Sequence, residues 1–367
     1  MKLKSLTRIL VLPAALAITA AIFTGCGSTG GNSATAVSGN TATIAQSDTE
    51  NSNSLAGTSI SITNVSYDPT RELYEQYNQL FSTYWKDKTG QTVEIVQSHG
   101  GSGSQARSVL EGNEADVVTL ALEGDVDILR ADGLIDDGWI GKFPDDSAPY
   151  TSTIVFLVRS GNPKSIQDWD DIVQPGVEVI TPDPKSSGGA RWNFLAAWAF
   201  ADKQNGGDEA KDKEFLKALY GNVSVLDSGA RGATTTFVEN KKGDVLLAWE
   251  NEAYLALKEH PGEYEIINPS LSILAQPSVA VVDANAKKHG TEEVSKAYLE
   301  YLYSDEAQRL EGQNFYRPSN PDILKEFSGQ LDLDIQLANI NDDFGGWAAA
   351  TKKFFADGAI FDQIYQR

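Results

Sequence analysis

Strand-like and helix-like segments alternate along the chain from Ser59 onward, and this alternation most restricts the folds that the chain can adopt. Such alternation is typical of an α/β fold, in which helices cover a largely parallel sheet. Residues 58–367 are numerous enough for two domains or one bilobal unit. We therefore expect an α/β protein with two lobes joined by a hinge.

Apolar runs bounded by turn residues predict the individual strands. They cover residues 60–65, 93–96, 116–121, 152–158, 177–181, 223–226 and 244–249. The runs at 116–121 and 152–158 are apolar enough to be buried parallel strands. Helical spacing of apolar residues predicts helices over residues 73–84, 106–110 and 191–200, the last of them well buried.

The order of these segments predicts where the chain passes between the lobes. We expect a first crossing near residues 159–163 and a return within residues 268–282. The expected division of the fold is residues 58–159 with 269–318 as lobe 1, residues 160–268 as lobe 2, and a C-terminal helical segment, 319–367, that spans both. A ligand would lie between them, where strands end and helices begin.

Three short Ser/Gly loops each lead directly into a helical pattern, at residues 99–104, 186–190 and 227–232. The first amides of a helix have no intrahelical partner and carry partial positive charge, so such a loop can hold an anion. Glycine permits close approach of a ligand to the backbone. A single loop of this kind is often an ordinary connector, but three together predict an anion held from several directions.

Three candidate residues each have a plain structural alternative. Asp68 precedes Pro69 at a helix start, where it is an N-cap or offers its amide to a ligand. Ser102 belongs to a loop that can be a flexible turn. Trp249 ends a predicted strand and is either a core residue or a donor of its indole N–H, which has no acceptor to repel an anion.

The second and third loops supply further candidates. Ser187, Gly188 and Gly189 lie between a predicted strand and an evident helix, which favours an anion-binding nest. Ala230 can contribute only its backbone amide.

Three basic side chains border the loops, namely His99, Arg191 and Arg231. These side chains could form salt bridges with the ligand directly, but we favour a supporting role in which they hold the ligand-binding peptide groups in place.

The formal charge of −21 argues against nucleic acid as a partner, since a binder needs a basic patch. It also opposes the approach of an anion, so affinity has to come from local dipoles and hydrogen bonds. The sequence contains three histidines and no H-E-x-x-H, GxSxG or P-loop motif. We expect neither catalysis nor a metal or cofactor.

The N-terminus predicts an export signal. Lys2, Lys4 and Arg8 precede a short apolar run, which ends in small residues before Cys26, the single cysteine. Residues 23–26 resemble a lipobox, so we expect residues 1–26 to be a lipoprotein signal peptide with Cys26 lipidated; a plain secretory signal is the alternative. Residues 27–57 are rich in Gly, Ser and Thr and predict a flexible tether. The protein would then lie at the outer face of the cytoplasmic membrane or in a periplasm.

Beyond these local signals, residues 59–367 resemble the bacterial sulfate-binding proteins of ABC importers. The specific stretches are NVSYDPTREL (64–73), QSHGGSG (97–103), ADVVTLAL (115–122), PKSSGGARWN (184–193), DSGARG (227–232) and AWENE (248–252). The resemblance implies a type II periplasmic-binding-protein fold and a monomer that binds sulfate and delivers it to an ABC permease. The lipobox predicts that the protein contacts the membrane only through its lipid anchor. The lipobox and tether depart from the soluble members of the family.

The resemblance also implies the roles of the site residues. The ligand donors would be the amides of Asp68, Ser102, Gly188, Gly189 and Ala230, the hydroxyl of Ser187 and the indole of Trp249. His99, Arg191 and Arg231 match positions that brace the binding peptides.

Sulfate suits a pocket made of donors because it carries no proton at neutral pH. Hydrogen phosphate would face one donor with its own proton, a mismatch of about 1–3 kcal/mol. A thiosulfate receptor of the same family is the alternative function. A phosphate-ester enzyme and a surface adhesion protein are alternatives from other classes, but neither is supported by a nucleophile, a metal motif or the three-loop layout.

Overall fold

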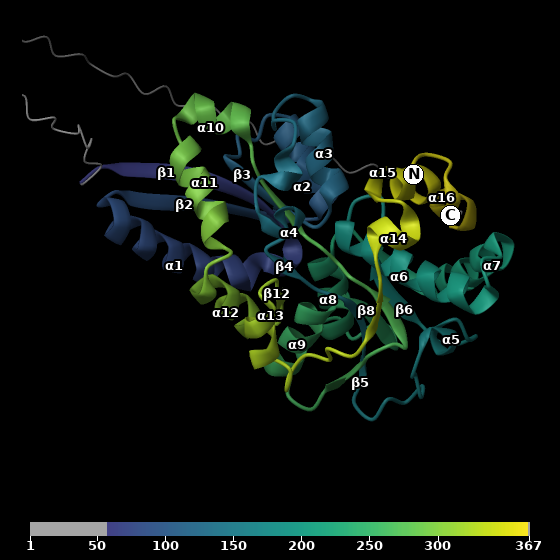
Figure 1. The fold of residues 1–367 in the computed structure, drawn as a ribbon. Coiled ribbons are helices and arrows are strands. Elements are labelled where there is room, and N and C mark those ends of the chain that lie inside the picture. The colour runs from purple at the N-terminus through teal and green to yellow at the C-terminus, as the bar shows by residue number, and fades with distance from the viewer. Residues whose placement is uncertain (1–56, 366–367) are drawn as a thin grey trace, which may run out of the picture. The chain divides into compact units, whose positions relative to one another are not determined.

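The computed structural model describes residues 57–365. The predicted signal peptide, Cys26 and all but the last residue of the predicted tether lie outside the described residues. Two sheets, each covered by helices, organise the described part of the chain (Figure 1).

The first sheet has four strands in the order β11-β3-β1-β2. Their bounds are β1 Ser59–Tyr67, β2 Thr92–Gly100, β3 Val117–Leu120 and β11 Ser278–Val281. β1 runs parallel to both β2 and β3, whereas β11 is antiparallel to β3. The predicted strands at 60–65, 93–96 and 116–121 are confirmed, and the parallel pairing brings the carboxyl ends of β1 and β2 to the same edge.

The second sheet has five strands in the order β7-β6-β8-β5-β9. Their bounds are β5 Ile154–Arg159, β6 Val179–Pro182, β7 Val223–Asp227, β8 Val245–Trp249 and β9 Tyr264–Ile267. β6 runs parallel to β7 and β8, but β5 is antiparallel to both of its neighbours, β8 and β9. The prediction that residues 152–158 form a parallel strand of the first lobe is therefore wrong.

The physical reason for this error is that β5 is buried along almost its whole length. An unbroken apolar run is typical of any strand covered on both faces, so it does not identify the partner or the direction of pairing.

The connections between the sheets lie side by side. Ser152 and Ala275 form an antiparallel bridge, with each amide donating to the other's carbonyl at 2.9 Å. The first crossing therefore precedes β5 and does not lie at residues 159–163, while the return falls inside the predicted 268–282. Beside it, the short strands β4 (Tyr150–Thr151) and β12 (Arg317–Pro318) pair antiparallel. Except at β5, the predicted lobe boundaries stay a prediction.

Helices of two groups cover the sheets (Figure 1). Those connected to the first sheet are η1 Asp68–Thr70, α1 Arg71–Thr89, α2 Ser102–Leu110, α3 Glu123–Ala131, η2 Trp139–Gly141, α4 Pro144–Ser147, α10 Asp283–His289, α11 Glu292–Tyr301 and α12 Asp305–Gln313. Those connected to the second are α5 Trp169–Ile172, α6 Gly188–Asn205, α7 Glu209–Gly221, α8 Ala230–Val238 and α9 Glu250–Glu259. The helices predicted over 73–84, 106–110 and 191–200 are confirmed.

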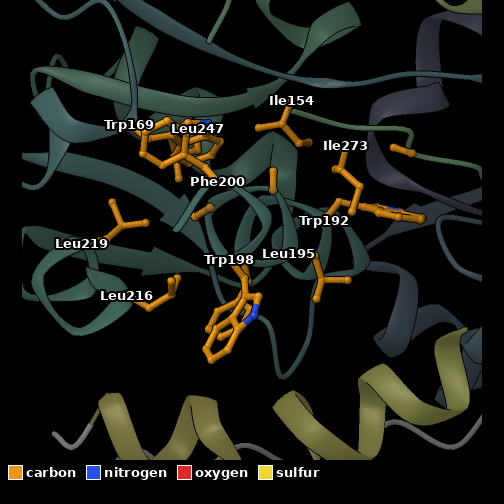
Figure 2. Close-up of a cluster of buried hydrophobic side chains, with 14 of the residues drawn as sticks. Ile154, Trp169, Trp192, Leu195, Trp198, Phe200, Leu216, Leu219, Leu247 and Ile273 are labelled. Carbon is orange, nitrogen blue, oxygen red and sulfur yellow. The ribbon is translucent and has the colours of Figure 1, made fainter. Parts of the chain in front are cut away.

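An aromatic and aliphatic core surrounds α6 in the second lobe (Figure 2). Trp192 and Leu195 of α6 are fully buried, as is Trp169 of α5, whose indole donates to the Leu271 carbonyl at 2.7 Å. Burial on nearly all faces of α6 agrees with its predicted apolar composition.

The C-terminal elements follow as α13 Pro321–Glu326, β13 Gln336–Ala338, α14 Ile340–Phe344, α15 Trp347–Ala350, the π-helix η3 Thr351–Phe355 and α16 Ile360–Ile364. β13 pairs with the short strand β10, Leu271–Ile273. Trp347 packs edge-to-face on Trp192, with ring centroids 4.6 Å apart, and also lies against Gly124 of α3. The C-terminal segment thus contacts helices of both groups.

None of the helices within residues 57–365 has the length and apolar composition required to cross a membrane.

Candidate anion-binding site

The three predicted Ser/Gly loops meet at one place. A methyl group on Gly101, in the β2–α2 loop, would lie 2.7 Å from the Ser228 carbonyl oxygen and 2.9 Å from that of Ser186. Ser186 belongs to the β6–α6 loop and Ser228 to the β7–α8 loop, and the Ser186 hydroxyl donates to the Ser228 carbonyl at 2.9 Å. The structure therefore brings all three loops into direct contact.

The candidate donors of these loops are neighbours as well. A methyl group on Gly188 would lie 3.0 Å from the Cβ of Ser102. One on Gly189 would lie 2.6 Å from the indole nitrogen of Trp249 and 3.5 Å from the Cβ of Ala230. Residues from four separate segments thus share one small volume where strands end and helices begin.

Asp68 lies at the same place, but it is not the N-cap that the sequence predicts. Tyr67 occupies the cap position and Asp68 is the first residue of η1, and no side chain of the described residues caps this helix. The turn is closed instead by Thr70, whose hydroxyl donates to the Tyr67 carbonyl at 2.7 Å. The carboxylate of Asp68 is directed to Gly229 of the other lobe. Burial raises the pKa of this carboxylate, although the charges of Arg71 and Arg231 act to lower it.

Ser187 is the N-cap of α6, and its hydroxyl oxygen accepts from the Ala190 amide at 3.3 Å. The hydroxyl proton remains available for another acceptor. Gly188 and Gly189 are the first residues of α6, so their amides have no intrahelical partner. One hydroxyl and two amides therefore converge at this helix terminus, where the dipole favours an anion.

Ser102 and Ala230 begin α2 and α8 and present their amides in the same way. The hydroxyl of Ser102 is already engaged, because it donates to Asp125 Oδ2 at 2.6 Å and accepts from the Ala121 amide at 3.0 Å. Only its amide is left for a ligand.

Trp249 ends β8 and is 1% exposed. Its ring packs against Tyr67 with centroids 5.3 Å apart, yet its indole nitrogen has no hydrogen-bond partner among residues 57–365. A buried donor without an acceptor costs about 1–3 kcal/mol. Trp249 is thus a core residue whose indole N–H is free to donate to an acceptor outside residues 57–365.

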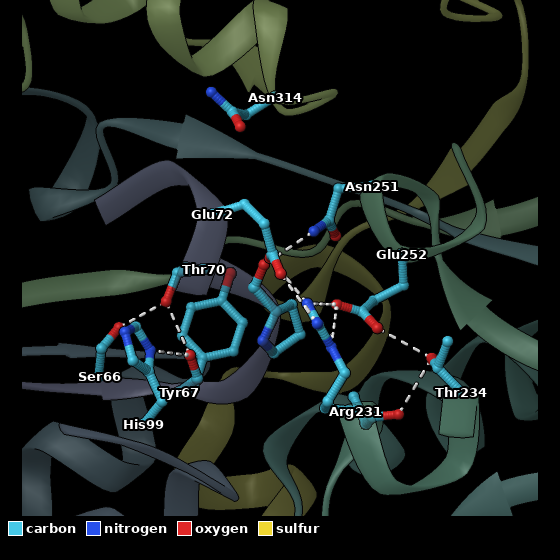
Figure 3. Close-up of polar contacts among 12 residues, drawn as sticks. Ser66, Tyr67, Thr70, Glu72, His99, Arg231, Thr234, Asn251, Glu252 and Asn314 are labelled. Carbon is cyan, nitrogen blue, oxygen red and sulfur yellow. Dashed lines mark hydrogen bonds and ion pairs between the residues drawn. The ribbon is translucent and has the colours of Figure 1, made fainter. Parts of the chain in front are cut away.

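Arg231 joins the two lobes and does not need the ligand as its counter-ion (Figure 3). It pairs with both carboxylate oxygens of Glu72 on α1, at 2.8 and 2.7 Å, and with Glu252 of α9 at 2.8 Å. Burial alone would lower the pKa of Arg231, but its hydrogen bonds and charge contacts with these two glutamates raise it. Thr234 donates to Glu252 at 2.9 Å and completes the cluster.

Arg191 and His99 hold backbone segments next to the site. Arg191 Nε donates to the Pro184 carbonyl at 2.9 Å, and its Nη1 lies 3.6 Å from Asp125, the carboxylate that fixes Ser102. His99 Nδ1 lies 3.4 Å from the Tyr67 carbonyl, and burial lowers the pKa of this imidazole to about 4. His99 is therefore neutral at pH 7.

Several residues of this arrangement were missed by the sequence reasoning, namely Glu72, Asp125, Asn251 and Glu252. Asn251 is fully buried and donates to the Pro69 carbonyl at 2.9 Å, a contact that links α9 to η1 (Figure 3). Glu72, Asn251 and Glu252 lie inside the family-like stretches, which was an available signal, whereas Asp125 lies outside them. No metal-binding group of three or more His, Cys, Asp or Glu side chains occurs within residues 57–365.

Comparison with known proteins agrees with this geometry. The family model described as bacterial extracellular solute-binding protein matches residues 63–317. A sulfate-binding protein of Escherichia coli K12 is 58% identical over 315 residues, which cover 86% of this chain and 95% of the relative. A thiosulfate-binding protein of Pseudomonas aeruginosa is 46% identical over 304 residues, covering 82% and 91%.

Among solved structures, the sulfate-binding protein SubI from Mycobacterium tuberculosis H37Rv superposes with a TM-score of 0.71 at 32% identity. The match covers 81% of this chain and 99% of SubI. The predicted bilobal α/β fold of the periplasmic-binding-protein type is confirmed. The individual ligand-binding residues stay a prediction.

Proposed function

Because the chain belongs to the bacterial extracellular solute-binding proteins, we propose that it captures sulfate outside the cytoplasm and delivers it to an ABC permease. The role is binding and delivery, without catalysis. The family membership and the high identity to sulfate-binding relatives support this function.

The observation that carries the proposal is the indole N–H of Trp249, which has no hydrogen-bond partner within residues 57–365 and lies beside the amide-rich starts of α2, α6 and α8. The ligand would be bound by the amides of Asp68, Ser102, Gly188, Gly189 and Ala230, by the Ser187 hydroxyl and by the Trp249 indole. Each group has a hydrogen to donate and none carries a full positive charge. Such a pocket matches an anion that only accepts hydrogen bonds, each charge-assisted bond contributing about 1.5–3 kcal/mol.

The three basic residues would act through the peptides that they hold. Arg231 already has two carboxylate partners and Arg191 has one, so their charge is compensated inside the protein. His99 is neutral at pH 7 because burial lowers its pKa to about 4. The dianion would therefore be stabilised by local dipoles, in keeping with the chain's net charge of −21.

Calorimetric titration of the purified protein with sulfate, thiosulfate and phosphate near neutral pH tests this function. We expect sulfate to bind more tightly than phosphate by roughly 5–150-fold, the equivalent of about 1–3 kcal/mol for one donor facing a proton. Equal affinity for phosphate, or no binding of any of the three, would contradict the proposal.

Thiosulfate is the second candidate ligand, because a thiosulfate-binding relative is 46% identical over most of this chain. Thiosulfate is also a tetrahedral dianion that only accepts hydrogen bonds. The same titration ranks the two ligands, and tighter binding of thiosulfate would make it the preferred one.

Lipid attachment at Cys26 would hold the monomeric receptor at the outer face of the cytoplasmic membrane, with residues 27–57 as tether. Metabolic labelling with a fatty-acid analogue tests this. Cys26→Ser should abolish the label and release the protein from the membrane fraction. Labelling of the Cys26→Ser variant, or an unlabelled wild-type protein, would contradict the anchor.

A further inference from the structure

Two glycines outside the proposed donor set face the opposite lobe across the site. Gly101 precedes α2 in the first lobe, and Gly229 precedes α8 in the second. Their φ angles are −59° and −155°, which any residue can adopt. Backbone conformation therefore does not explain why these two positions lack a side chain.

The lack of room for a side chain explains why position 101 is a glycine. A methyl group there would lie 2.7 Å from the Ser228 carbonyl oxygen and 2.9 Å from that of Ser186, both in the second lobe. These obstacles are backbone atoms, so neither can rotate away, and the hydrogen bond from Ser186 to Ser228 ties them together. A side chain at position 101 would hold the facing loops apart.

Lack of room for a side chain also explains the glycine at position 229, but a different group occupies the space there. A methyl group at Gly229 would overlap carboxylate oxygen Oδ2 of Asp68, in the first lobe. The next nearest atoms are Asp68 Cγ at 3.4 Å and the Gly101 amide nitrogen at 3.5 Å, both near ordinary contact distances. The terminal part of one side chain is thus the main obstacle at this position.

We propose that Gly101 and Gly229 are closure glycines: their missing side chains allow the two lobes to approach until the donors of both can reach one anion. The inference rests on the proposed function and adds two residues that need not touch the ligand. Hydrogen bonds weaken steeply outside a window of a few tenths of an ångström, so a displacement of that size at closure suffices to lower affinity.

The test compares sulfate affinity among single alanine variants by calorimetry. Gly101→Ala and Gly229→Ala should each bind sulfate at least about tenfold more weakly than wild type. Gly221→Ala is the matched control, because Gly221 ends α7 and, outside its own stretch of that helix, no atom within residues 57–365 lies within 4 Å of the added methyl group. This control should bind as wild type does.

A double-mutant cycle separates closure from any local effect on the loops. Asp68→Ala keeps the backbone amide but removes the carboxylate that a methyl group at Gly229 would meet. Asp68→Ala/Gly229→Ala should therefore regain most of the affinity lost in Gly229→Ala, measured against Asp68→Ala alone. Asp68→Ala/Gly101→Ala should regain none, because carbonyl groups obstruct position 101.

Two further measurements distinguish closure from folding. The melting temperature of ligand-free Gly101→Ala and Gly229→Ala should equal that of wild type. X-ray scattering measures the decrease in radius of gyration when sulfate is added to the wild-type protein, and we expect both variants to lose this decrease. Wild-type affinity and compaction in both variants would overturn the inference. The inference would also be overturned if the variants had a lower ligand-free melting temperature than wild type but the same compaction on sulfate addition, because that result indicates a purely structural contact. A wild-type protein that binds neither sulfate nor thiosulfate would instead refute the proposed function, and the closure role with it.

Discussion

Trp249 is a buried core residue that we also propose as a ligand donor. Its ring is part of the second-lobe core and packs on Tyr67 of the first lobe, while its N–H has no acceptor within residues 57–365. Removing an unpaired buried donor relieves a desolvation cost, whereas removing a ligand contact weakens binding. Removal of the Trp249 N–H should therefore lower the affinity for the ligand without lowering the stability of the ligand-free protein.

Trp249→Phe should weaken sulfate binding by about 10–100-fold, the loss of one charge-assisted hydrogen bond. The ligand-free protein should remain as stable as wild type or become slightly more stable. Calorimetry and thermal unfolding measure both quantities. Trp139→Phe is the control, because the Trp139 indole already donates to Asp127 at 3.1 Å. Unchanged sulfate affinity in Trp249→Phe would remove the indole from the site.

Glu72 pairs across the lobes with Arg231, and both side chains are roughly 30% exposed. The hydrogen bond and charge of Arg231 lower the pKa of Glu72 against the effect of burial. Arg231 retains Glu252, which is 2% exposed, when Glu72 is neutralised. The pair should therefore assist closure without being essential to it.

Glu72→Gln should weaken sulfate binding by less than about fivefold, since partly exposed ion pairs contribute about 0.2–1 kcal/mol. Added salt should reduce the difference from wild type. Glu75→Gln on the same helix is exposed and serves as the control. A loss of a hundredfold or more would show that Arg231 needs both carboxylates to hold the site together.

Among the elements, α10 ends in a charged cluster with residues that precede β3. His289 Nδ1 lies 2.8 Å from Asp116 and its Nε2 lies 3.0 Å from Glu114, beside β3. Hydrogen bonds to Asp116 and Glu114 raise the pKa of His289. A raised pKa in the folded state means that the imidazolium stabilises the fold at low pH.

The stabilisation from His289 should be complete below about pH 6.5, the value of an unperturbed histidine, and should disappear as pH rises through the raised pKa. Denaturant unfolding of His289→Gln should therefore show a larger loss of stability at about pH 5.5 than at about pH 9. Lys288→Gln removes another cation beside Glu114 and is the matched control. The same pH trend in both variants would exclude the imidazole as its origin.

The elements also show where local sequence patterns are sufficient and where they are not. β1, β2, α1 and α6 follow directly from apolar periodicity and loop composition, because each pattern depends on neighbouring residues. β5 does not, because the choice between two sheets depends on residues about 90 positions away, in β8. The predicted cap of η1, Asp68, is one residue too late, because Tyr67 occupies the cap position and the Thr70 hydroxyl closes the turn by donating to the Tyr67 carbonyl.

At the scale of the whole molecule, the net charge of −21 opposes the arrival of an anion. The Debye length falls from about 30 Å at 0.01 M salt to about 8 Å at 0.15 M. Long-range repulsion should therefore weaken as salt is added, while contacts inside the closed site change little.

The association rate constant for sulfate should rise when sodium chloride is increased from about 0.01 M to about 0.15 M. Stopped-flow tryptophan fluorescence can follow binding, and sucrose at equal osmolality controls for effects unrelated to charge. A rate constant that falls with salt would mean that a local positive field, rather than the net charge, governs capture.

The sequence by itself determined the α/β alternation, the three Ser/Gly loops at strand ends and the identity of the candidate donors, because these are properties of short contiguous segments. Only the tertiary structure decided the direction of β5 and the pairing of Glu72 with Arg231 and of Asp125 with Arg191. It also placed two carbonyl groups of one lobe against Gly101 of the other. These features depend on distances between residues far apart in the chain, and no local pattern encodes such distances.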